Sequence, residues 1–214
     1  MMHRRPNSKS LETVTAADGD AVSLADLKAY LVIESTSDDD MLTRFIAQAQ
    51  QAVQDYIHRA IQPQTLRLWM DAFPGDNDDA LVALGSGIHD ISRRALLGDG
   101  DMIDLPMPPL VSVSSVKTYD TLNTESTFDS AAYMLDGSRG RLVLNSGYSW
   151  PTGLRAYRGV AIEYVAGYAT IPGPIVAGIT AYAAHLYECR GVCTMPDTCK
   201  AMIEPYRIVD RLAW

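Results

Sequence analysis

The residues most able to support chemistry lie near the C-terminus, where Cys189, Cys193 and Cys199 follow His185. Thiolates and imidazoles are ligands that zinc prefers, so these four side chains could supply a tetrahedral site. The intervals of three and five residues between the cysteines are uncommon for zinc, and a glycine and a proline interrupt the segment. Ordinary buried or surface thiols are therefore the favoured interpretation, and a structural zinc site is the alternative.

The redox state of these cysteines follows from their number and context. Three cysteines cannot all pair within one chain. The N-terminus is briefly basic but is not followed by the apolar segment of a secretory signal. We therefore expect Cys189, Cys193 and Cys199 to be reduced thiols in a cytosolic assembly environment.

Other catalytic patterns are missing from the sequence. The four histidines do not accompany a recognisable nucleophile motif, and neither G-x-S-x-G nor a phosphate-binding glycine loop occurs. The acidic run at 76–79 lacks the spacing of a calcium loop. The sequence thus predicts that the protein is not an enzyme and that it needs no cofactor or metal.

Composition limits the possible partners. The 214 residues are 47% hydrophobic and 21% charged, which is typical of a folded domain, and the net charge is −8. An acidic chain is a poor general ligand for the phosphate backbone of nucleic acids. No apolar run approaches the ~20 residues of a membrane span, so we expect no membrane partner.

Helical signals dominate the N-terminal part of the chain. After residues 1–21, interpreted as a flexible arm, Ser23 and Asp26 have the spacing of a capping box before a short helix. A serine followed by three aspartates at 37–40 then opens a long helix, whose apolar residues recur every three or four positions up to Pro63. Residues 22–62 are predicted to be the helical part of the core.

The hydrophobic period changes to two after Pro63. Alternation at 65–70, 111–113 and 160–164 predicts strands, so 63–171 is interpreted as an antiparallel β insert; the role of its acidic loop at 75–101 is open. Residues 172–192 form a core helix that starts at a proline pair, and 193–214 form an extended C-terminal tail. The predicted fold class is α+β, with two N-terminal helices, a β insert and a C-terminal helix.

The C-terminal tail contains residues that often dominate protein interfaces. Tyr206, Arg207, Arg211 and Trp214 are of the types enriched at binding hot spots. A tail that folds back onto its own domain would use the same residue types. Both interpretations stand at this point.

Three stretches in order carry a resemblance to a known family. The first stretch is 22–31, together with the acidic residues at 38–40 and the end of the long helix at 56–60. The second stretch is 106–116. The third stretch is 150–190, together with Tyr206 and Arg207 near the C-terminus. This set resembles the phage head–tail connector (adaptor, head-completion) proteins, in particular an insert-bearing branch of putative phage proteins with a possible part in DNA packaging. The resemblance extends over about residues 22–210.

The resemblance implies a structural role in a virion or a gene transfer agent. Such proteins form a homo-oligomeric ring, usually a dodecamer, under the portal protein, and carry the next connector, the stopper or a tail protein. DNA passes through the lumen without sequence-specific binding, and acidic walls would repel it. Tyr206, Arg207, Arg211 and Trp214 become candidate portal contacts. The expected location is the head–tail junction, after assembly in the cytoplasm of a bacterial host.

Alternative functions belong to other classes. A head-closure stopper or tail terminator is a second ring protein, although its mainly β fold fits the helical order poorly. A zinc-dependent enzyme built on His185 and the cysteines, and a β binding module for carbohydrate or protein, are further alternatives.

Overall fold

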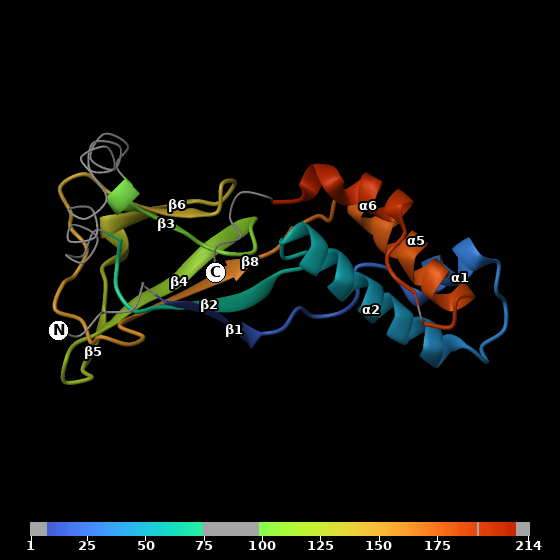
Figure 1. Ribbon diagram of the computed structural model, residues 1–214, viewed down its shortest axis with the longest axis horizontal. Coiled ribbons are helices and arrows are strands. Elements are labelled where there is room, and N and C mark those ends of the chain that lie inside the picture. The colour runs from blue at the N-terminus through green and yellow to red at the C-terminus, as the bar shows by residue number, and fades with distance from the viewer. Residues whose placement is uncertain (1–7, 75–98, 192, 209–214) are drawn as a thin grey trace, which may run out of the picture. The chain divides into compact units, whose positions relative to one another are not determined.

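The computed structural model describes residues 8–74, 99–191 and 193–208 and divides the chain into two compact units. Unit 1 contains the chain up to residue 16 together with 65–166, and unit 2 contains 17–64 together with the segment that starts at 167. Helices and antiparallel strands are thus separated, as in the predicted α+β class (Figure 1).

Unit 2 consists of four helices in its described part: α1 (Leu24–Leu31), α2 (Asp39–Ile57), α5 (Gly173–Glu188) and α6 (Asp197–Ile203). Helix α2 packs against α5, and α5 packs against α6. Apolar residues of these elements form one core, to which α2 contributes a single apolar stripe and the mostly apolar α5 contributes a wider face. The core includes Leu27, Leu42, Phe45, Ile46, Ala49, Val53, Ile57, Ile175, Ile179, Ala183, Leu186, Cys199 and Ile203.

Local signals explain where these helices begin and end. Ser23 caps α1, since its hydroxyl accepts a hydrogen bond of 3.1 Å from the amide of Asp26. Asp38, and not the expected Ser37, precedes α2 and makes no side-chain cap, so the acids of the first turn act there through the helix dipole. Helix α5 ends at Glu188, and Arg190 and Gly191 then turn the chain at φ values of +56° and +81°. The amide of Gly191 donates to the carbonyl of Leu186 at 2.7 Å.

Unit 1 is built from two antiparallel sheets. The larger sheet has the order β1 (Lys9–Thr15), β2 (Gln64–Met70), β8 (Val160–Ala166), β4 (Leu110–Tyr119) and β5 (Glu125–Thr127). The smaller sheet has the order β3 (Met102–Asp104), β7 (Arg141–Leu144) and β6 (Tyr133–Asp136), and β6 contacts β4.

The core of unit 1 lies on one face of the larger sheet. Inward residues alternate with outward ones along β2, whose burial alternates strictly from Gln64 to Met70. Tyr164 on β8 is fully buried, and its hydroxyl donates to the carbonyl of Pro106 at 3.0 Å. Burial raises the pKa of Tyr164, so it remains a neutral donor.

Two expectations about the chain ends are corrected by the structure. Residues 9–15 do not belong to a flexible arm; they form β1, which pairs with β2 from Lys9 opposite Met70 to Thr15 opposite Thr65. The tail from 193 is not extended as expected, because Asp197–Ile203 form α6 and bury Cys199 and Ile203. In both places tertiary contacts supply the partners that the local sequence lacks.

Candidate interaction surfaces

The segment after α6 docks onto the C-terminal end of α2. The hydroxyl of Tyr56 donates to Glu204 at 2.5 Å, and Arg59 donates to the carbonyl of Tyr206 at 2.5 Å. The guanidinium of Arg207 lies 4.7 Å from the ring centre of Tyr56. The hydrogen bond to Glu204 raises the pKa of Tyr56, because it favours the neutral phenol.

This docking places two of the four predicted portal contacts. Tyr206 and Arg207 are half-buried, and the amide of Ile208 donates to the carbonyl of Ile57 at 3.1 Å. Tyr206 and Arg207 therefore fold back onto their own unit, which is the alternative left open by the sequence. Arg211 and Trp214 lie outside the described residues, and the portal contact itself stays a prediction.

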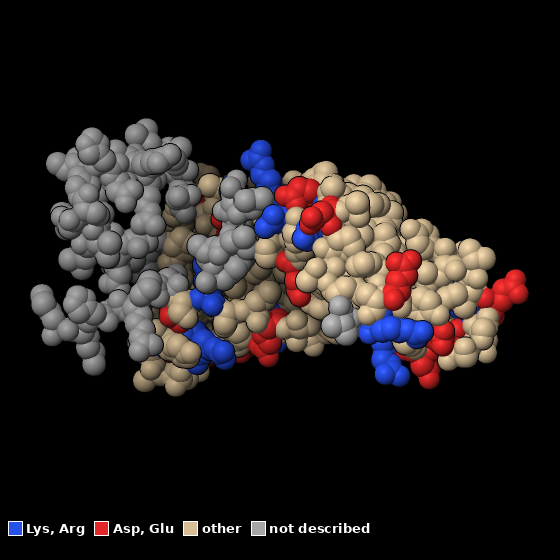
Figure 2. Space-filling model, turned by 45° about the vertical axis from the view of Figure 1, so that its right-hand side comes forward, with Lys and Arg blue, Asp and Glu red and all other residues tan. Residues whose placement is uncertain are grey.

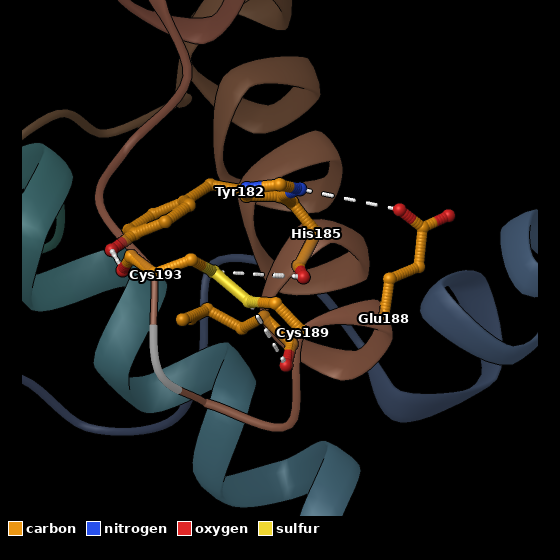
Figure 3. Close-up of a disulfide and its surroundings, with 6 residues drawn as sticks. Tyr182, His185, Glu188, Cys189 and Cys193 are labelled. Carbon is orange, nitrogen blue, oxygen red and sulfur yellow. Dashed lines mark hydrogen bonds and ion pairs between the residues drawn. A yellow bond between two sulfur atoms is a disulfide. The ribbon is translucent and has the colours of Figure 1, made fainter.

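The cysteine cluster differs from the sequence expectation. Cys189 and Cys193 form a disulfide with a Cα–Cα distance of 6.2 Å (Figure 3), so these two are not reduced thiols. The reason is the chain reversal at Gly191, which returns Cys193 to the last turn of α5. Cys199 is a free, buried cysteine, and burial raises the pKa of its thiol.

The disulfide also decides what the cluster can do chemically. The potential ligand atoms of His185, Cys189 and Cys193 lie within 4.8 Å of one another, and the imidazole is 4.0 Å from Glu188 (Figure 3). Cys199 does not belong to this group. Sulfurs joined to each other supply no thiolate for a metal. The four-ligand zinc alternative is therefore not assembled in this arrangement.

The outer face of the larger sheet carries a row of cross-strand ion pairs. Arg67 on β2 lies between Glu163 on β8 and Glu12 on β1, at 2.7 and 3.7 Å. Lys117 on β4 pairs with Glu125 on β5 at 2.7 Å and holds the pKa of that carboxyl below its usual range. Pairs across neighbouring strands each contribute modestly to sheet stability.

Aromatic rings and arginines extend this face. The rings of Trp69 and Tyr119 are 5.9 Å apart, with Arg158 5.4 Å from the Trp69 ring and Arg155 4.2 Å from the Tyr119 ring. The two arginines belong to the loop before β8. That loop, with Asn123, lines a shallow open hollow of about 440 Å³.

Sequence reasoning missed this sheet face, because its members come from different strands and a distant loop. Alternation along β2 and β4 could have assigned Arg67, Trp69 and Lys117 to one face. Alternation along one strand does not reveal which strand lies next to it in the sheet. Acidic and basic side chains are mixed on the described part of the surface that Figure 2 shows.

Comparison with known proteins identifies the fold. The family described as phage gp6-like head–tail connector protein matches residues 21–84. A chain in the structure of the neck of an empty gene transfer agent (GTA) particle, computed with C6 symmetry, aligns with a TM-score of 0.71 and 23% identity, over 96% of this chain and 98% of that one. The resemblance to head–tail connectors is confirmed.

Two further GTA structures give the same result. A chain of the native GTA virion aligns with a TM-score of 0.68 and 22% identity, over 95% of this chain and 98% of that one. A chain in the neck of the native particle, computed with C12 symmetry, aligns with a TM-score of 0.67 and 23% identity, over 96% and 98%. No curated protein matches the sequence.

The head–tail connector match by sequence covers α1, α2 and β2. The structural match is much longer and includes both units, so the β unit and α5 belong to the shared fold as well. No helix in the described part of the chain is long and apolar enough to cross a membrane.

Proposed function

We propose that this protein is a structural head–tail connector of a tailed-phage-like particle, where it forms a ring that joins the capsid to the tail. The observation that carries this proposal is the match of nearly the whole chain to chains of GTA particle necks. The family match at 21–84 supports the same role from the sequence side. The connector acts by binding and positioning, without a catalytic step.

The ring is proposed to be a dodecamer under the portal protein, with the next connector, stopper or tail protein on its other side. C6 and C12 symmetry in the necks of the matched structures supports a ring. A closed ring needs a heterologous contact, in which one surface of each copy binds a different surface of the next. Helices α2 and α5, packed against each other, give unit 2 a stiff support for the surfaces that make such contacts.

DNA is proposed to pass through the ring without sequence-specific binding. The net charge of −8 supports this, because copies with an acidic balance offer DNA few adhesive contacts. The proposed location is the head–tail junction of the particle, with assembly in the host cytoplasm.

The portal contact is proposed to use the C-terminal residues. Tyr206 and Arg207 dock on Tyr56 and Arg59, so the last described residues of the chain are held on unit 2. Arg211 and Trp214 follow that point in sequence and are the candidates for direct contact, with Tyr206 and Arg207 orienting them.

The test is to mix the purified full chain with its cognate portal and image the mixture by electron microscopy. We expect rings on the tail-side face of the portal. Replacing Arg211 and Trp214 with alanine should abolish decoration of the portal and leave the circular dichroism spectrum unchanged. The control is Tyr148, an exposed tyrosine of unit 1, and Tyr148→Ala should leave decoration of the portal intact. A wild-type chain that never decorates the portal would refute the connector function.

A further inference from the structure

An exposed patch on unit 1 combines apolar surface with positive charge. Leu122 and Tyr157 have exposed fractions of 83% and 67%. Arg155 connects the loop of Leu122 to the loop of Tyr157. It donates to the side chain of Asn123 at 3.2 Å and to the carbonyl of Arg158 at 2.8 and 3.0 Å. We call Leu122, Arg155, Tyr157 and Arg158 the basic patch.

Arg158 is the residue of the basic patch that is available to a partner. Its side chain is exposed, and its guanidinium makes no ion pair with the described part of the chain, while Trp69 stacks on one side of it. Its φ is +51°, a left-handed conformation that is costly for a side chain with a Cβ. The hydrogen bond from its amide to Asp71 at 2.9 Å holds that conformation and fixes the direction of the loop.

A second exposed patch lies on unit 2, where α1 ends. Tyr30 and Val32 have exposed fractions of 60% and 87%. Val32 has a φ of +57°, which is rare for a β-branched residue and presents its side chain to solvent. An ion pair of 2.7 Å between Lys28 and Asp39 joins α1 to the first turn of α2, where Asp40 is exposed. Glu34 is exposed between the two helices, and neither Glu34 nor Asp40 makes an ion pair with the described residues. We call Tyr30, Val32, Glu34 and Asp40 the acidic patch.

We infer that the acidic patch of one copy binds the basic patch of the next copy, and that this is the heterologous contact of the ring. The two patches have opposite charge, and each has two exposed large apolar residues that a soluble monomer would leave in water. Tyrosine, present in both patches, and arginine, present in the basic patch, are residue types enriched among those that contribute most at interfaces. The inference rests on the proposed ring, which requires two different complementary surfaces on each copy.

The experiment exchanges the charges of the two patches. Arg158→Glu places two negative patches against each other, and Glu34→Lys places two positive patches against each other. We expect each variant alone to lose rings in the presence of the cognate portal, as seen by electron microscopy and sedimentation. An equimolar mixture of the two variants should restore rings with alternating copies, and so should the double variant, because both then present opposite charges at the contacts.

The restoration separates a lost contact from a lost fold, since a misfolded variant cannot be rescued by mixing. Arg139→Glu, the same charge change on the β6–β7 turn, is the matched control and should form rings as the wild type does. Normal rings from Arg158→Glu alone, or no rescue by mixing, would refute this interface and leave the connector function standing. If Arg158→Glu formed intact rings that retained less DNA than wild-type rings, Arg158 would be assigned to a contact with DNA. That result would also overturn the inference. Failure of the wild type to form rings would contradict the connector function itself.

Discussion

At the residue scale, a few positions are fixed by backbone geometry. Gly167 follows β8 with a φ of +137°, and a Cβ there would collide with the backbone of Gln62 and Pro63. The amide of Tyr168 next to it donates to the carbonyl of Ile61 at 3.3 Å. The return of the chain from β8 toward α5 thus requires a residue without a side chain.

Gly167→Ala should therefore lower the free energy of unfolding by about 2 kcal/mol or more, from the combined cost of the strained φ and the collision. Gly147→Ala is the matched control, since Gly147 has a φ of +86° and open space around it. It should cost about 1 kcal/mol, the strain alone. Urea denaturation of both variants measures the difference, and equal losses would contradict the collision.

At the scale of elements, β1 shows how a weak segment gains structure from its neighbour. Its residues are almost all exposed, with Leu11 and Val14 42% accessible, so burial contributes little to its stability. Its order comes from pairing with β2 and from side chains that cross between them. Glu12 accepts a hydrogen bond of 3.0 Å from Trp69, and the amide of Ser8 donates to Asp71 at 3.1 Å.

Deletion of residues 1–15 should destabilise unit 1 by about 2 kcal/mol, or roughly 4–8 °C in Tm, because it removes a strand and leaves β2 as an unpaired sheet edge. Deletion of 1–7 alone, which keeps β1, is the control and should change Tm little. Differential scanning calorimetry compares the two truncations. Equal Tm values for both would show that β1 contributes nothing to the unit.

At the scale of the whole molecule, charge separates a connector from a nucleic-acid-binding protein. The balance is acidic; Arg67 on the larger sheet is paired with Glu163, and Arg155 in the loop before β8 lies over the ring of Tyr119. Counter-ion release, the main source of non-specific affinity for DNA, needs many free basic side chains on one surface.

The isolated chain should show no measurable binding of duplex DNA at about 0.15 M salt, by fluorescence anisotropy with a labelled duplex. Arg67→Ala, which leaves Glu12 and Glu163 without their cation, should not change that result. Saturable binding with a steep salt dependence would contradict the expectation and would require a basic surface on the chain.

The sequence by itself determined the helices and the strands with strong alternation, because their signals are local. The capping serine of α1, the apolar stripe of α2, the prolines before α5 and the glycine after it are all readable within a turn or two. The same local signals, in order, carried the resemblance to head–tail connectors. The class α+β followed from the change of hydrophobic period near Pro63.

Only the tertiary structure decided which distant segments meet. It turned the expected arm into β1, folded the expected tail into α6, joined Cys189 to Cys193, and set Arg155 and Arg158 on the rings of Tyr119 and Trp69. The physical reason is common to all four. Each depends on a partner outside its own local sequence, such as a strand edge, a core surface, a returning loop or an aromatic face, and local propensity carries no information about that partner.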